Sequence, residues 1–328
     1  MENFINPKQV YADLRSDFMF KKAFGQKHIM IPFLNSVLKT DRIIDIDYRN
    51  VENWGLSPED RKVFYDVYCH TSDGNDIIVE MQKREQKYYR DRCIFYSSFP
   101  IHRQFLDAKN EFLLQFENDT EKPPFIWDYR LHPVYVISIL DFVMQHEPSW
   151  PQDRFHSCYR LKEETYHESY SDTLNFIFIE LPRFNKVAED IGDDIDRWMY
   201  LFKNMSKLQS VPKNFEKTWM SDLFDTAKIA NFAPKERQKY LEDQKMLYDY
   251  QNCIDFAVEK AAKENLEKGL AEGEAKGREE GKIEGKIEGK IEGKIEIATT
   301  MLKNHVPIEQ ICLYTGLSEI EINKLINR

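Results

Sequence analysis

The sequence predicts an α/β fold in which helices pack against a mixed β-sheet. In the first 200 residues, segments with helical periodicity alternate with segments rich in β-branched and aromatic residues. Residues 64–70 and 77–82 flank the turn-forming run TSDGND, so they are expected to form a β-hairpin. Residues 134–140 (VYVISIL) are almost continuously apolar, which is typical of a buried strand. The predicted order is a helix, three strands, a helix and a further strand.

The first two elements are predicted from their periodicity. Residues 18–38 have apolar residues at helical spacing, so we expect a helix that is interrupted or ended early around Gly25 or Pro32. Residues 43–51 alternate as a strand does. The residues expected to share its apolar face are Ile44, Ile46 and Tyr48.

Later segments extend this fold. Residues 175–181 are predicted to form an added strand, and residues 193–205 an added helix. Residues 213–262 have a helical pattern. Their aromatic residues are interpreted as core anchors, and these are Phe215, Trp219, Phe224, Tyr240, Tyr248 and Phe256.

The predicted hairpin brings two acidic residues together. With the turn centred near residues 73–74, Asp66 lies opposite or almost opposite Glu80, and Glu80 and Gln82 share one face. Like charges on neighbouring strands repel each other, but a hard cation between them would make the pair favourable. The hairpin is therefore a candidate metal site. Alternatively, both acids simply face water.

A basic segment follows the hairpin. Residues 83–103 contain six basic and two acidic residues, although the whole chain has a net charge of -10. Apolar residues recur there at helical spacing, so we expect an amphipathic helix that begins just after the strand with Glu80. Basic side chains beside a carboxylate pair suit a phosphodiester substrate. The alternative is a solvated, charged helix face.

These segments, in this order, resemble the PD-(D/E)XK nucleases, and most closely the recombination-promoting nuclease and PD-(D/E)XK transposase family. The similar stretches are SDFMFKKAFG (16–25), the hairpin, Arg92 followed by Tyr96, HPVYVISILDF (132–142), FIFIELPRF (176–184) and DDIDRW (193–198). The resemblance covers roughly residues 10–205. It implies a restriction-endonuclease-like mixed sheet flanked by helices, followed here by a helical C-terminal tail.

The resemblance also implies roles for individual residues. Asp66 and Glu80 would hold Mg²⁺, with Mn²⁺ able to substitute, and Asp17 would be an additional acid near the site. Gln82 occupies the position where the wider fold usually has lysine. Lysine can stabilise negative charge on the phosphate, whereas an amide can only form hydrogen bonds, for example to the attacking water. The residues expected to contact the DNA backbone are Lys83, Arg84, Lys87, Arg90 and Arg92.

The expected function is that of a Mg²⁺-dependent DNA endonuclease that serves recombination or transposition-like processes. The competing hypothesis is a nuclease fold without catalytic activity that binds nucleic acid or protein. An ATP-driven motor is excluded because the first 268 residues hold only four glycines and no glycine-rich phosphate loop. The nuclease domain, with its helical extension, is assigned to residues 8–262.

Cysteine usage and hydropathy indicate the cytoplasm. The five cysteines are odd in number and widely spaced, and no CxxC pair occurs, which favours reduced thiols. The N-terminal residues lack the pattern of a secretory signal, and the most apolar run has only seven residues. We therefore expect neither export nor a membrane span.

A glycine repeat marks the C-terminal tail. Within residues 263–296, seven of the twelve glycines recur at every fourth position, and the last cycles read Lys-Ile-Glu-Gly. Each helical glycine costs about 1 kcal/mol relative to alanine, so an isolated helix is marginal. The repeat is either a flexible linker or a helix paired with another copy of the chain. The second possibility predicts a homo-oligomer assembled through the tail.

The last segment, residues 297–328, is predicted to be a small two-helix module. Helices are expected over residues 307–313 and 318–326, on either side of Thr315-Gly316-Leu317. The spacing resembles a helix-turn-helix. The second helix has few basic residues for phosphates or bases, so we favour an interaction module over a DNA reader.

Overall fold

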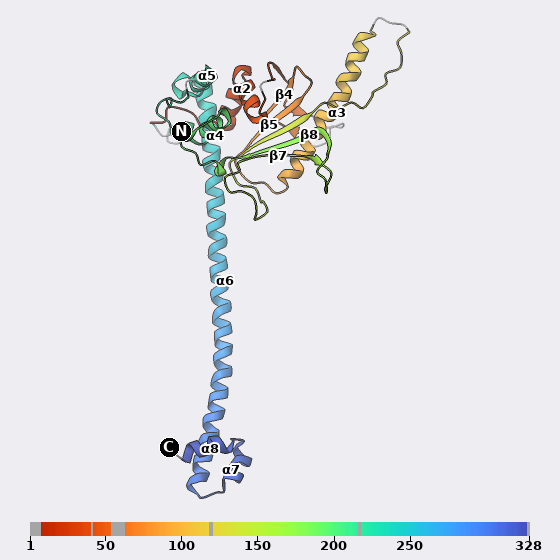
Figure 1. The fold of residues 1–328 in the computed structure, drawn as a ribbon. Coiled ribbons are helices and arrows are strands. Elements are labelled where there is room, and N and C mark those ends of the chain that lie inside the picture. Colours follow the sequence, from red (N-terminus) through yellow and green to blue (C-terminus); the bar gives the residue numbers. More distant parts are fainter. Residues whose placement is uncertain (1–7, 41, 54–62, 118–120, 216–217, 327–328) are drawn as a thin grey trace. The chain divides into compact units, whose positions relative to one another are not determined.

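The computed structural model describes residues 8–40, 42–53, 63–117, 121–215 and 218–326 (Figure 1). The chain divides into two compact units, Met1–Tyr248 and Asp249–Arg328. The α-helices are α1 (Asp17–Phe24), α2 (Lys27–Leu38), α3 (Tyr89–Gln115), α4 (Asp194–Asn204), α5 (Thr218–Ala227), α6 (Pro234–Lys303), α7 (Ile308–Thr315) and α8 (Glu319–Ile326). Short 3-10 helices lie at Leu181–Arg183, Ala188–Asp190, Met205–Lys207 and Ile229–Asn231.

Within the described residues, the first unit contains a six-stranded mixed sheet with the order β1-β4-β5-β6-β8-β7. Its strands are β1 (Ile46–Tyr48), β4 (Val67–Thr71), β5 (Asp76–Gln82), β6 (Val134–Leu140), β7 (His156–Lys162) and β8 (Ser169–Glu180). β5, β6 and β8 are parallel, and the outer pairings are antiparallel. A separate pair is formed by β2 (Glu52–Asn53) and β3 (Val63–Phe64). The predicted mixed α/β fold is confirmed.

The two faces of the sheet bury different helices. Residues of odd number in β5, such as Ile77 and Val79, pack in the main core together with α1, α2, α4 and α5. Ile78, on the other face, packs with Tyr89 and Cys93 of α3 in a second cluster. Because side chains alternate along a strand, Glu80 and Gln82 point to the face that α3 covers.

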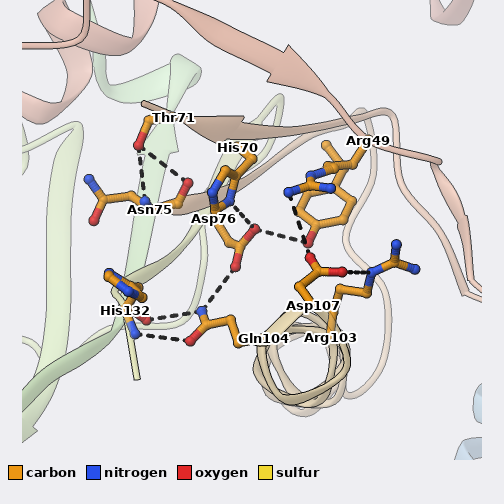
Figure 2. A network of polar contacts seen from close by, with 10 residues as sticks. Arg49, His70, Thr71, Asn75, Asp76, Arg103, Gln104, Asp107 and His132 are labelled. Atoms are coloured by element: carbon orange, nitrogen blue, oxygen red, sulfur yellow. Dashed lines mark hydrogen bonds and ion pairs between the residues drawn. The ribbon is translucent and has the colours of Figure 1, made fainter. Parts of the chain in front are cut away.

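A buried polar network fixes α3 against the hairpin (Figure 2). Asp76, at the start of β5, accepts hydrogen bonds from the Tyr68 hydroxyl at 3.0 Å and from Gln104 Nε2 at 2.9 Å. Its Oδ1 also lies 3.0 Å from Nδ1 of His70. Gln104 in turn accepts a 2.9 Å hydrogen bond from the backbone N–H of His132. The network sets the position of α3 along the sheet, and thereby the position of its first turns beside Glu80.

Most predicted elements are confirmed. The first helical segment is divided at Gly25 into α1 and α2, whereas Pro32 lies inside α2. The hairpin β4–β5, the buried strand β6 and the helix α4 are present as expected. β8 is longer than its prediction, and β7 was not predicted.

The prediction for residues 43–51 is wrong in extent and face. β1 covers three residues, Ile44 is 78% exposed, and Ile43 is buried instead. The reason lies in the pairing: Ile46 pairs with Thr71, the last residue of β4, so the residues before Ile46 have no strand partner. Tyr48 is at the sheet edge, where its hydroxyl donates a 2.7 Å hydrogen bond to the Phe24 carbonyl.

The basic helix begins later than predicted. Tyr88 has the left-handed backbone angle φ = 63°, so α3 starts at Tyr89, and Lys83, Arg84 and Lys87 lie in the preceding loop. The helix also continues past Arg103 to Gln115. Its apolar spacing is confirmed, since Tyr89 and Cys93 are buried against the sheet.

The predicted core role of the C-terminal aromatic residues is only partly right. Phe215, Phe224 and Tyr240 are buried in the main core, and Trp219 packs against it. The prediction is wrong for Tyr248 and Phe256, whose exposed fractions are 56% and 68%. Tyr240 is the most C-terminal member of the main core, so later residues of α6 do not contribute to it.

In the second unit, the glycine repeat is helical and forms part of α6. Residues near the end of α6 pack with α7 and α8 in a small core that contains Ala298, Ile311, Leu317 and Ile322. Gly316 ends α7 with the left-handed angle φ = 66°, a conformation that glycine adopts without steric cost. The two predicted short helices are confirmed.

Candidate nuclease site

Two acidic residues meet across the hairpin. Val67 pairs with Val79 in the antiparallel register, so Asp66 lies across from Glu80. The backbone N–H of Asp66 donates to Glu80 Oε1 at 3.4 Å, and the backbone N–H of Met81 donates to Asp66 Oδ2 at 2.8 Å. The structure thus brings together the two acids that the sequence placed on opposite strands.

Glu80 is buried, and Asp66 is half-buried. Glu80 is 2% exposed, and burial raises the pKa of Glu80 to about 8, with a further contribution from the charge of Asp66. Burial also raises the pKa of Asp66, although the hydrogen bond from Met81 and the charge of Lys21 oppose the shift. Raised pKa values show that burial disfavours the charged form of both carboxyl groups, and a divalent cation would favour that form.

Gln82 and Arg92 both contact the second oxygen of Glu80. Gln82 Nε2 donates to Glu80 Oε2 at 3.0 Å, and Arg92 Nη2 lies 3.5 Å from the same oxygen. Arg92 also donates to Gln86 Oε1 at 2.7 Å and lies 4.7 Å from the ring centre of Tyr96. Arg92, which we expect to contact the DNA backbone, therefore also contacts Glu80 of the candidate site.

Asp17 and Lys21 lie on one face of α1, at one edge of the site. Their side chains form an ion pair at 2.7 Å, and the side chain of Asp17 is 59% exposed. Burial lowers the pKa of Lys21, but the hydrogen bond to Asp17 and the charges of Asp17, Asp66 and Glu80 outweigh this effect and raise it. The positive charge of Lys21 thus acts on both carboxylates. We did not predict a role for Lys21, but its position four residues after Asp17 was a usable signal because such residues share a helix face.

The remaining basic residues occupy different surroundings. Lys83 is half-buried, and burial lowers its pKa, whereas the charges of Asp13 and Asp243 oppose the change. Lys87 is exposed, and its ammonium group lies 4.8 Å from the ring centre of Tyr88. Arg90 is also exposed and donates to the Gln145 carbonyl at 3.0 Å. Arg84 is half-buried in the same loop as Lys83 and Lys87.

The donor set fits a hard divalent cation that is shared with other oxygen ligands. Asp66 and Glu80 supply carboxylate oxygens, which Mg²⁺ prefers. No group of three or more His, Cys, Asp or Glu side chains in the described part of the chain is arranged to hold a metal ion. The two carboxylates would therefore share the ion with water and phosphate oxygens, as is usual for Mg²⁺.

Comparison with known families agrees with this geometry. A family model described as "PD-(D/E)XK nuclease family transposase" matches residues 14–257, well over half of the chain. The chain belongs to this family. The resemblance stated from the sequence is confirmed, and the sheet with its flanking helices is the PD-(D/E)XK fold.

Membership in the PD-(D/E)XK nuclease family of transposases makes this a nuclease-fold protein of a group related to transposition. No curated protein and no solved structure is significantly similar to the chain. Among the described residues, no helix is both long and apolar enough to cross a membrane.

Proposed function

We propose that this protein is a Mg²⁺-dependent DNA endonuclease that hydrolyses phosphodiester bonds in recombination or transposition-like processes, within the cytoplasm. The observation that carries the proposal is the pair of buried Glu80 and half-buried Asp66, held together across one hairpin in a chain of the PD-(D/E)XK family. Two neighbouring carboxyl groups whose charged forms are disfavoured by burial are better explained by ion binding than by stability.

The residues around the pair have separate roles in this proposal. Asp66 and Glu80 would hold the cation, which would supply Lewis-acid stabilisation of phosphate charge and lower the pKa of bound water. Gln82 and Arg92 fix the orientation of Glu80 through its Oε2 atom. The amide oxygen of Gln82 accepts a hydrogen bond from the attacking water and orients it.

Lys21 supplies the positive charge that Gln82 lacks. It comes from α1 instead of β5, and its charge already acts on Asp66 and Glu80. During hydrolysis the Lys21 ammonium would stabilise the negative charge that develops on the phosphate. Asp17 pairs with Lys21 and serves as a positioning residue that keeps the ammonium group at the edge of the site.

The DNA backbone is proposed to follow the loop before α3 and the first turn of that helix. Lys87 and Arg90 are the exposed cations of this region and are assigned to phosphates, with Lys83 and Arg84 beside them. The chain has a net charge of -10, so binding depends on this local concentration of positive charge.

Plasmid cleavage tests the proposal directly. Purified protein should nick or linearise DNA with Mg²⁺ or Mn²⁺ and stop when EDTA is added. Asp66→Asn should abolish cleavage, whereas Asp47→Asn, a matched change at an exposed position of β1, should not. Absence of metal-dependent cleavage by the unmodified protein would contradict the proposal.

A second candidate function is DNA binding without cleavage. The observation that favours it is Gln82, which stands where lysine is usual in the fold and is already bonded to Glu80. Under this alternative the protein binds DNA equally well with and without Mg²⁺, and Asp66→Asn leaves binding unchanged.

We also propose that the protein assembles into a homo-oligomer through α6. We divide the chain functionally into a nuclease domain (8–262), the repeat (263–296) and a terminal module (297–328). In the repeat, the isoleucines are exposed to 36–55%, these being Ile283, Ile287, Ile291 and Ile295. A Cβ added to any of its seven glycines would meet nothing within 4 Å. Pairing with the same segment of a second copy would bury the isoleucines and let the backbones approach closely at the glycines.

A further inference from the structure

A cavity of about 840 Å³ opens beside the candidate nuclease site. Its wall combines the start of α3, the segment after β6, and β7. Five aromatic residues contribute to it, namely Tyr88, Tyr89, Phe142, Trp150 and Tyr159. Cavities of this size and lining are typical of sites for small organic groups, and the volume is ample for one nucleotide.

Two connections join the cavity to Glu80. Gln86 lines the cavity and accepts the hydrogen bond from Arg92, which contacts Glu80 Oε2. Tyr89 also lines it, and its hydroxyl donates at 2.9 Å to Ser138 Oγ. Ser138 is the register partner of Glu80 on β6. One side chain, that of Arg92, therefore connects Gln86 in the cavity wall with Glu80 of the proposed metal site.

The aromatic walls offer faces on which a base can stack. Tyr88 is 68% exposed, lines the cavity and has a left-handed backbone just before α3 begins. Tyr159, on β7, is 36% exposed and also lines the cavity. Stacking of bases on such rings is worth about 1–3 kcal/mol per base and tolerates any sequence.

The charged groups of the wall suit the edge of a base better than a phosphate, since three of them are acids and one, Arg90, is basic. Glu85, Asp91 and Glu147 are exposed acids that line the cavity. Carboxylates repel phosphates but accept hydrogen bonds from the amino and imino groups of bases.

We propose that this cavity receives one unpaired nucleobase adjacent to the scissile phosphate, so that the enzyme acts on single-stranded or locally melted DNA. This inference rests on the proposed nuclease function. In intact duplex, a base must first be unstacked and unpaired to enter the cavity, which costs a few kcal/mol. Lys87 and Arg90, which lie just before α3 and in its first turn, meet the flanking phosphates, while the base itself lies among the aromatic and acidic groups.

Binding of short oligonucleotides in EDTA tests the inference without relying on cleavage. The probe is a fluorescent dT oligonucleotide of about ten residues, compared with a series in which one position at a time is abasic. We expect one abasic position to weaken binding by about 5- to 100-fold, the range that corresponds to the loss of one stacked base. 2-Aminopurine at that position should be quenched upon binding. Equal affinity across the abasic series would overturn the inference.

Two double variants test whether the cavity causes the difference in affinity between the intact and the abasic oligonucleotide. Tyr88→Ala with Tyr159→Ala should remove most of the difference between the intact and the abasic oligonucleotide. Tyr166→Ala with Tyr170→Ala is the matched control, because both tyrosines are more than 80% exposed outside the cavity. An unchanged base dependence in the first pair would refute the assignment to this cavity.

The outcomes for the two proposals are distinguishable. Base-dependent binding without metal-dependent cleavage would retain the cavity and refute the nuclease function. Cleavage of single-stranded and duplex DNA at equal rates, unaffected by Tyr88→Ala, would retain the nuclease function and refute the cavity.

Discussion

The backbone N–H of Asp66 donates a hydrogen bond to Oε1 of Glu80, so the main chain of one proposed metal ligand holds the side chain of the other. The relationship is independent of the Asp66 side chain. Substitutions of that side chain can therefore remove a metal ligand while Glu80 keeps its backbone donor.

Asp66→Asn should reduce metal-dependent cleavage by at least about 100-fold, because stabilisation by a bound metal ion is worth several kcal/mol. The amide keeps an oxygen for the Met81 N–H, and the change removes a carboxyl group whose charged form is disfavoured by burial. The melting temperature in EDTA should thus be equal to or higher than that of the unmodified protein. Thermal denaturation and plasmid cleavage measure both effects, and retention of full cleavage would exclude Asp66 as a ligand.

Lys21→Gln should slow cleavage by about 10- to 100-fold, since a preorganised charge beside the developing phosphate charge is removed. Asp17→Asn should have a smaller effect, because Asp17 is exposed and acts through Lys21. Single-turnover rates at saturating Mg²⁺ distinguish the two variants. A larger loss for Asp17→Asn than for Lys21→Gln would reverse the assigned roles.

Stability of the metal-free protein should decrease as the pH rises from about 4.5 to about 8. Folded Glu80 retains its proton up to the upper value, whereas the unfolded chain releases it near the lower one. The folded state therefore binds more protons across this window, and its stability falls with increasing pH. The raised pKa of Asp66 acts with the same sign.

Urea denaturation in EDTA at several pH values measures the slope of the free energy of unfolding against pH. Glu80→Gln should flatten it, and Glu85→Gln, a change at an exposed neighbour, should leave it unchanged. Addition of Mg²⁺ should flatten it as well, because the cation replaces the proton. A slope that is identical in Glu80→Gln and the unmodified protein would contradict the assignment.

Lys87→Ala combined with Arg90→Ala should weaken binding to all DNA sequences alike. The plot of log affinity against log salt should become less steep by roughly 0.7 per lost contact for single strands and 0.9 for duplex. Lys109→Ala, an exposed site further along α3, provides the control. If the slope does not change, the loop before α3 is not the DNA contact.

Replacement of the four repeat isoleucines by glutamine should convert the protein to a smaller assembly. Glutamine is at least as good a helix former as isoleucine, so the helix itself should persist while its apolar surface is lost. Light scattering at matched concentrations measures the mass, and circular dichroism checks the helix content. Identical masses would show that the repeat does not mediate assembly.

The sequence alone determined the features that depend on short-range pairing. The Asp-Gly turn and the alternating residues on both sides predict the hairpin, and its register then places Asp66 across from Glu80. The break at Gly25, the buried strand β6 and the two short C-terminal helices follow from equally local signals. Each of these features depends on residues that are within about fifteen positions of one another.

Tertiary structure decided what depends on packing between distant segments. The contact of Arg92 with Glu80 depends on where α3 packs on the sheet, and Gln104 of α3 is hydrogen-bonded there to Asp76. The proximity of Lys21 to the carboxylates depends in the same way on the packing of α1 in the main core.

The length of β1 was set by the end of its partner β4. The cavity is lined by Tyr88, Trp150 and Tyr159, which come from three separate segments. The spacing of these residues along the chain does not predict that they line one cavity. Local periodicity specifies which face a residue occupies, whereas the buried contacts of the folded core decide which faces meet.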